Sequence, residues 1–177
     1  MDMELTYIYH SGFALSGDGF TVIMDYYRDS EDGQAQADLN RLMDGTFSNQ
    51  EAGMPEGTVH SELLRRPGKL YVLASHFHPD HFNKEVLQWR EQRPDIIYIF
   101  SKDILRHRRA QKEDAVWLKK GEEYKDETLS VRAFGSTDVG VSFLLQASGK
   151  KIFHAGDLNN WHWMDESLSL IHISEPT

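Results

Sequence analysis

The octapeptide SHFHPDHF, residues 75–82, constrains the fold of this chain more than any other stretch. It overlaps the apolar run KLYVLAS, residues 69–75, which is typical of a short buried strand. His76 and His78 would lie about 200° apart on a helix, whereas positions i and i+2 of a strand point the same way. Pro79 disfavours helix at the residue before it. The sequence therefore predicts an extended loop leaving a buried strand, with both imidazoles on one side.

The same loop carries a set of metal donors. Asp80 and His81 add a carboxylate and a third imidazole to His76 and His78. Such a set suits zinc, iron or manganese and disfavours calcium or magnesium. The chain has no cysteine, so any metal must bind nitrogen and oxygen atoms. The alternative is a surface loop that happens to be rich in histidine. Three histidines and an aspartate directly after a buried strand favour the metal site.

The segment before the loop predicts β structure and then a polar excursion. Two β-rich runs within residues 4–27 surround Gly17-Asp18-Gly19, a strong hairpin signal, and the second run ends at Asp25. Residues 28–57 are polar and predict a long loop, which is either a lid over the site or a segment without a catalytic part.

After the loop, the pattern predicts a helix, a strand and a helix, followed by four further β runs with ASGKK as the last hairpin turn. These elements cover residues 83–93, 95–101, 101–112, 115–120, 129–135, 141–146 and 150–156. Hairpin-paired strands with interspersed helices indicate a layered α/β (α+β) fold, without internal repeats or a second domain.

Composition narrows the function classes. The formal net charge of −9 argues against a nucleic-acid or anionic-membrane partner. No apolar run approaches the length of a membrane span, and the acidic start MDMELTYIYH is unlike a signal peptide. We therefore expect a cytoplasmic protein with a small-molecule substrate and neither a nucleic-acid nor a membrane partner.

The C-terminal stretch LSLIHISEPT, residues 168–177, resembles the translation of a sequencing-library adapter. We expect it to be a non-native tail, with a genuine amphipathic C-terminus as the alternative. On this interpretation a single domain covers residues 1–167 and is incomplete at its C-terminus, and His172 is not a ligand.

Three stretches carry a resemblance to a known family. SHFHPDHF resembles the H-x-H-x-D-H motif of the metallo-β-lactamase superfamily, and IFHAGDLN, residues 152–159, resembles its later G-D motif. The hairpin that ends at Asp25 resembles the superfamily's opening hairpin with its strand-end aspartate. The resemblance implies a four-layer αββα fold. The segment YHSGF, residues 9–13, is most similar to the branch of ascorbate-phosphate lactonase-like proteins.

The resemblance also implies a ligand set. His76 and His78 would bind a first metal, Asp80 and His81 a second, and Asp157 would bridge them. Two zinc ions are expected in the full-length protein, with manganese or iron as alternatives.

Two further ligands of the family are not matched. Ser136 stands where the family has a third histidine, so Asp138 or His162 would have to substitute. The family's final histidine would lie beyond residue 167. Without a substitute, the first site keeps two histidines and a carboxylate, the set associated with iron.

The activity implied by the resemblance is metal-assisted hydrolysis of a small ester, lactone or phosphate-bearing substrate. Asp80 would be the catalytic residue that orients or deprotonates the attacking water, or would only support the histidines. The alternatives are a mononuclear iron oxygenase on the same fold and a non-catalytic metal-binding member.

Other polar and aromatic residues have less specific signals. His10 and His154 are interpreted as structural histidines at strand ends, with a role in a pocket as the alternative for His10. Trp161 and Trp163 either line a substrate pocket or pack in the core. The basic run RHRRAQK, residues 106–112, is interpreted as a solvated helix face.

Overall fold

The structure is a computed structural model, and it describes residues 3–29, 60–137 and 139–157. Contacts divide the chain into two units. The first unit comprises Met1–Ala74 and His78–Tyr98, and the second comprises Ser75–Phe77 and Ile99–Thr177. Within the described ranges, no helix has the length and apolar character needed to cross a membrane.

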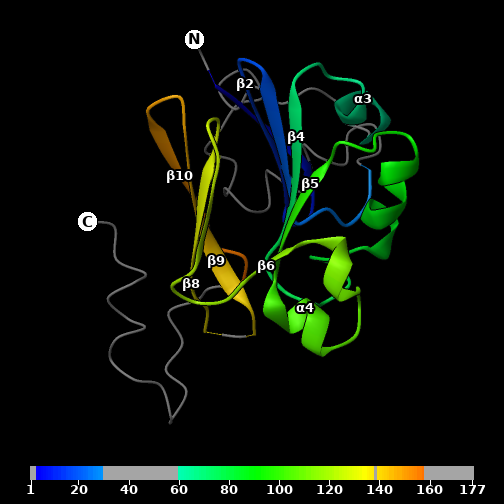
Figure 1. The fold of residues 1–177 in the computed structure, drawn as a ribbon, viewed down its shortest axis with the longest axis vertical. Coiled ribbons are helices and arrows are strands. Elements are labelled where there is room, and N and C mark those ends of the chain that lie inside the picture. Colours follow the sequence, from blue (N-terminus) through cyan, green and yellow to red (C-terminus); the bar gives the residue numbers. More distant parts are fainter. Residues whose placement is uncertain (1–2, 30–59, 138, 158–177) are drawn as a thin grey trace, which may run out of the picture. The chain divides into compact units, whose positions relative to one another are not determined.

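The first unit is built on four neighbouring strands (Figure 1). These are β1 (Glu4–Tyr9), β2 (Gly12–Gly17), β3 (Phe20–Met24) and β4 (Lys69–Ala74). The β1–β2 and β2–β3 pairs are antiparallel and the β3–β4 pair is parallel. Gly17 pairs with Phe20, which confirms the hairpin predicted around Asp18-Gly19.

The prediction of two β runs in residues 4–27 was wrong in one respect, because the first run is two strands. β1 and β2 are joined by a tight turn at His10 and Ser11, where Tyr9 pairs with Gly12. His10 has a φ of 56°, in the left-handed region that histidine enters more readily than most residues. The run has no Asn-Gly or Asp-Gly at this point, so its turn was not recognised.

The core of the first unit explains why β3 and β4 read as continuous apolar runs. Every residue of β3 is buried, and so is every residue of β4 after Lys69. A strand buried on both faces has no polar side to alternate with. The most deeply buried large side chains of this unit are Tyr7, Ile8, Leu15, Phe20, Ile23, Met24, Leu63, Tyr71, Phe82 and Trp89.

The helix predicted after the histidine loop is a 3₁₀ helix, η1 (Lys84–Glu91). The side chain of Asn83 caps this helix by accepting a hydrogen bond from Glu85 N. The buried residues are Val86 and Trp89, three positions apart. Residues three apart share a face of the helix, so this helix packs through Val86 and Trp89.

The strand predicted over 95–101 is β5 (Ile97–Ser101), which pairs in parallel with β6 (Val116–Leu118). Within the first unit the neighbouring strands follow the order β1-β2-β3-β4. The following helix, α4 (Lys102–Arg106), is shorter than predicted. It ends because Arg108 takes a φ of 55°, and a left-handed residue after the last turn closes a helix.

A second sheet lies within the second unit and has the order β10-β9-β8-β7, all antiparallel. Its strands are β7 (Glu123–Lys125), β8 (Ser130–Gly135), β9 (Val141–Ala147) and β10 (Lys150–His154). Ala147 pairs with Lys150, which confirms the final hairpin turn. The short strand β7 was not predicted. Side chains that alternate between buried and exposed positions, as in β8, give this sheet its apolar face.

The mixed α/β class expected from the sequence is confirmed by these two sheets and their few helices. The single domain over residues 1–167 stays a prediction. The proposed lid at 28–57, apart from its first two residues, and the tail at 168–177 lie outside the described residues.

Candidate metal centre

The histidine loop follows β4 directly, but residues 75–78 form bends instead of the extended segment predicted, and residues 79–81 form a turn. The backbone N–H groups of His81 and Phe82 both donate to the carbonyl oxygen of His78, at 3.0 and 2.8 Å. This turn contains Pro79 and brings Asp80 and His81 back beside the first unit's strands. The loop predicted at the end of a buried strand is therefore observed.

His81 is fixed by a buried carboxylate. Its Nδ1 lies 2.8 Å from Oδ2 of Asp25, and the side chains of His81 and Asp25 are 1% and 0% exposed. Asp25 follows β3 with a φ of 48°, and its N–H donates to Leu73 O at 2.9 Å. A carboxylate can only accept here, so Nδ1 carries the proton and Nε2 keeps its lone pair for a metal.

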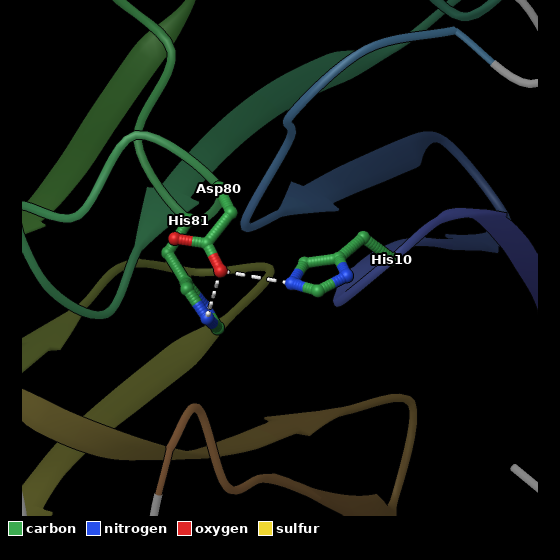
Figure 2. A group of neighbouring side chains, drawn as sticks. All are labelled: His10, Asp80 and His81. Atoms are coloured by element: carbon green, nitrogen blue, oxygen red, sulfur yellow. Dashed lines mark hydrogen bonds and ion pairs between the residues drawn. The ribbon is translucent and has the colours of Figure 1, made fainter.

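Asp80 lies between two histidines of the first unit (Figure 2). Its Oδ2 is 2.8 Å from Nε2 of His10 and 3.6 Å from Nε2 of His81. Partial burial acts to raise the pKa of the Asp80 carboxyl, but the hydrogen bond from His10 and the electrostatic attraction of the nearby His81 imidazole outweigh it. The pKa of Asp80 is therefore below its usual value, and the group is a carboxylate at neutral pH.

These three side chains form a compact set of donors. One ligand atom from each of His10, Asp80 and His81 lies within 4.8 Å of the others, and two imidazoles with one carboxylate could hold a transition metal. Sequence interpretation assigned Asp80 and His81 to such a site and missed His10. The loop motif gave no signal for it, because His10 comes from a turn far away in the sequence.

The second unit brings together two other predicted ligands. His76 is 1% exposed, and its Nε2 lies 3.1 Å from Oδ2 of Asp157. Its Nδ1 lies 2.9 Å from the hydroxyl oxygen of Ser75. The segment after β10 also contacts the segment after β8, because Thr137 Oγ1 donates a hydrogen bond to Asp157 O at 3.5 Å. The G-D segment and the first histidine of the loop therefore meet, as the resemblance implied.

Two glycines make this approach geometrically possible. A Cβ on Gly140 would lie 2.2 Å from Ser75 O and 2.5 Å from the Cβ of His76, and a Cβ on Gly156 would lie 2.8 Å from Ser75 Oγ. Both glycines also have positive φ, of 81° and 58°. A side chain at either position would push against the backbone that carries His76. The glycine of the G-D motif is thus explained by close packing onto the histidine loop.

A buried aspartate that the sequence interpretation missed holds the residue between the first two histidines. Asp103, in the first turn of α4, accepts a hydrogen bond from the N–H of Phe77 at 2.9 Å. The ring of Phe77 stacks on His107, with centroids 3.7 Å apart and planes at 8°. His107 Nδ1 in turn lies 2.9 Å from Asp103 O. Helix α4 therefore braces the loop through backbone and ring contacts.

The other residues singled out in the sequence lie at strand ends, on the exposed surface or outside the described residues. Ser136 follows β8, at the end of the strand where the family's third histidine was expected. Asp138, His162, Trp161 and Trp163 lie outside the described residues. His154 is buried at the end of β10 and belongs to none of the possible metal groups among the described residues. In the basic run, residues 106–108 are exposed, which fits a solvated surface.

Comparison with family models identifies the chain. A model described as a beta-lactamase superfamily domain matches residues 4–173. The chain belongs to the beta-lactamase superfamily. No curated protein matches it in a sequence comparison. The metallo-β-lactamase fold expected from the two motifs is therefore confirmed, and the lactonase-like branch stays a prediction.

Solved structures of the superfamily fold match most of the chain. Igni18, a metallo hydrolase from the archaeon Ignicoccus hospitalis, matches at 19% identity with a TM-score of 0.58 over 88% of this chain. A possible metal-dependent hydrolase from Veillonella parvula matches at 14% identity, with a TM-score of 0.60 over 98% of this chain. CmlA, a diiron beta-hydroxylase from Streptomyces venezuelae, matches at 16% identity, with a TM-score of 0.56 over 90%.

At these identities the similarity shows the fold alone. The chain spans 61% of Igni18, 67% of the Veillonella protein and 30% of CmlA. The activity, substrate and partners of this superfamily member are therefore matters for proposal.

Proposed function

We propose that this superfamily member is a metal-dependent hydrolase acting on a small ester, lactone or phosphate-bearing substrate. The observation that carries the proposal is the pairing of His81 with the buried Asp25 at 2.8 Å, which presents Nε2 of His81 beside the carboxylate of Asp80. A buried carboxylate on the far nitrogen of an imidazole is the usual support of a metal ligand.

The proposed metal ligands are His76, His78, Asp80, His81 and Asp157. The donor chemistry fits zinc, with manganese or iron as alternatives, because it consists of imidazole and carboxylate groups alone. Within the second unit, His76 Nε2 and Asp157 Oδ2 are 3.1 Å apart. Within the first, His81 Nε2 and Asp80 Oδ2 are 3.6 Å apart. Both separations are close to the spacing of neighbouring ligand atoms around one ion, about 3.3 Å for bonds of about 2 Å.

When bound, a metal of this class lowers the pKa of a coordinated water towards neutrality and polarises a carbonyl or phosphoryl oxygen. Asp80 is proposed to orient the attacking water and to accept its proton at a carboxylate oxygen. The lowered pKa keeps Asp80 ionised, which favours orientation of the water, while it also makes the carboxylate a weaker base. Without a metal, the hydrogen bond from His10 restrains the rotation of the same group. Asp25 keeps the ring of His81 in one tautomer throughout.

A second candidate is an iron oxygenase on the same fold. It is favoured by Ser136, which replaces an expected imidazole and leaves a first site of two histidines and a carboxylate. The structural similarity to CmlA agrees with the fold of such an enzyme and adds nothing on the reaction.

The test compares reactions of the chain loaded separately with Zn²⁺, Mn²⁺ and Fe²⁺. Hydrolysis of a panel of esters, lactones and phosphodiesters should require the metal and fall by about 10²-fold or more in Asp80→Asn. Asp95→Asn is the matched control, since Asp95 is an exposed carboxylate paired with Arg93. Thiol-dependent oxygen uptake with one iron per chain would favour the oxygenase. Bound metal without any turnover would contradict both and favour a non-catalytic member.

A further inference from the structure

His10 lies outside the loop that carries the proposed ligands, yet its ring meets them. The residue sits in the turn between β1 and β2, and its Nε2 is 2.8 Å from Asp80 Oδ2 (Figure 2). Its ring also lies edge-on to that of His81, with centroids 6.0 Å apart. All three residues belong to the first unit.

We propose that His10 is itself a metal ligand and forms, with Asp80 and His81, a two-histidine, one-carboxylate site for a divalent transition metal such as Zn²⁺. This goes beyond the proposed function, because it concerns metal binding and is independent of the reaction. Three donors on one side of an ion leave coordination positions open for water or a substrate oxygen.

The distances agree with a site that needs little rearrangement. Ligand atoms around a tetrahedral zinc ion lie about 3.3 Å apart when the bonds are about 2.0 Å. The His81–Asp80 pair is already at 3.6 Å, and the His10–Asp80 pair, at 2.8 Å, has to open by only about 0.5 Å. The metal would replace the proton that Nε2 of His10 now shares with the carboxylate. The ring stays neutral by carrying its proton on Nδ1 instead.

The backbone and the neighbouring rings hold His10 in this position. Its φ of 56° lies in the left-handed region, so the turn maintains the conformation against a local preference. Tyr27 packs edge-on against the imidazole at a centroid distance of 6.0 Å, and Tyr9 stacks on Tyr27 at 5.9 Å. The side chain is 48% exposed, which leaves solvent access for an incoming ion.

A purely positioning role is the competing explanation, in which His10 only orients Asp80 through the hydrogen bond. The two roles respond differently to substitution. Glutamine places an N–H near the position of the histidine Nε2 and can keep the bond to Asp80, but it is a poor ligand for zinc. Asparagine tolerates a positive φ yet is too short to reach Asp80. Ser11→Ala changes the same turn without removing a donor of the group.

The experiment measures Zn²⁺ affinity and stoichiometry by competition with a chromophoric chelator, and coordination by the visible absorption of the Co²⁺-loaded chain. His10→Gln and His10→Asn should both weaken binding at one site by more than about tenfold, and both should change the Co²⁺ spectrum. Ser11→Ala should behave as the wild type. Recovery of wild-type affinity and spectrum in His10→Gln would overturn the ligand assignment in favour of positioning.

A measurement on the wild type keeps the test independent of variant folding. The ring nitrogens of His10 should shift in ¹⁵N-detected imidazole spectra when Zn²⁺ is added, because Nε2 becomes metal-bound. Unchanged resonances at saturating Zn²⁺ would refute the proposal. The Zn²⁺ titrations contain no substrate. A failure to hydrolyse any ester would therefore count against the proposed function and leave the assignment of His10 as a ligand unaffected.

Discussion

His81 and Asp25 form a buried pair in which Nδ1 of the imidazole lies 2.8 Å from Oδ2 of the carboxylate. Both partners are essentially inaccessible to solvent. A buried carboxylate and a buried imidazole each lose hydration, and the hydrogen bond between them compensates that loss. The bond also decides which nitrogen of His81 faces Asp80, so it links the end of β3 to the chemistry of the loop.

Removing this support should weaken metal binding without removing a ligand. Asp25→Ala is expected to lower Zn²⁺ affinity by about 10- to 100-fold, the range found when a carboxylate behind a metal-bound histidine is lost. Asp25→Asn keeps an acceptor for the Nδ1 proton and should lose less. Chelator-competition titration measures both. Asp29→Asn is the control, because Asp29 accepts instead from the hydroxyl of Tyr26 at 2.8 Å. Equal affinities in all three variants would contradict the role of Asp25.

Close packing at Gly140 should be intolerant of a single methyl group. Gly140→Ala places a Cβ 2.2 Å from Ser75 O, whereas Gly149→Ala, at a similar positive φ, meets nothing within 4 Å. The backbone strain is therefore matched, and the difference reports packing alone. We expect Gly140→Ala to lower the free energy of unfolding by about 1–3 kcal/mol more than Gly149→Ala, measured by urea denaturation. Similar losses of unfolding free energy in the two variants would mean that the histidine loop shifts to accommodate the added methyl group without cost.

The hydrogen bond from Phe77 N–H to Asp103 in α4 should stabilise the histidine loop. Asp103→Ala leaves the N–H of Phe77 without its carboxylate acceptor and should lower the free energy of unfolding by about 1–3 kcal/mol. It should also weaken Zn²⁺ binding, because Phe77 connects His76 to His78. Asp103→Asn retains an acceptor oxygen and should recover part of both losses. Thermal unfolding with and without Zn²⁺ tests both effects. An unchanged midpoint in Asp103→Ala would show that the hydrogen bond to Phe77 does not stabilise the loop.

Stability should depend on acid pH through Glu122. The backbone N–H of Lys119 donates to its carboxylate, and Lys102 pairs with it at 3.2 Å, so the pKa of Glu122 is held below its ordinary value of 4.5. A depressed folded pKa contributes stability above the ordinary value, and that contribution is lost as the pH falls through the folded pKa. The stability difference between the wild type and Glu122→Gln should therefore be present at pH 7 and shrink below about pH 4.5.

The same difference should fall with added salt, because the Lys102 pair is exposed and screened. Glu123→Gln removes a neighbouring charge of β7 and serves as the control. A difference between wild type and Glu122→Gln that grows on acidification would have the wrong sign and would contradict the assignment.

The loop motif and most strands could be predicted from local sequence. The KLYVLAS run, the spacing of His76 and His78, and the two-residue turns at Asp18-Gly19 and Ser148-Gly149 each carry their own short-range signal. The turn at His10 was missed although Ser11-Gly12 is a known turn signal, because the β-rich run continues on both sides of it. The helix after the loop was predicted from the sequence, but its 3₁₀ geometry was not.

The sequence alone determined which donors this protein has: imidazoles and carboxylates, without cysteine, gathered mainly at the end of one buried strand. Only the tertiary structure decided how they are supported. His10 meets Asp80 across 70 positions, and Asp25 meets His81 across 56. Such contacts are fixed by strand pairing and burial, so no local pattern predicts them. Asp103 is the clearest case, since a lone aspartate in a short helix gains its role only when the backbone of Phe77 is placed against it.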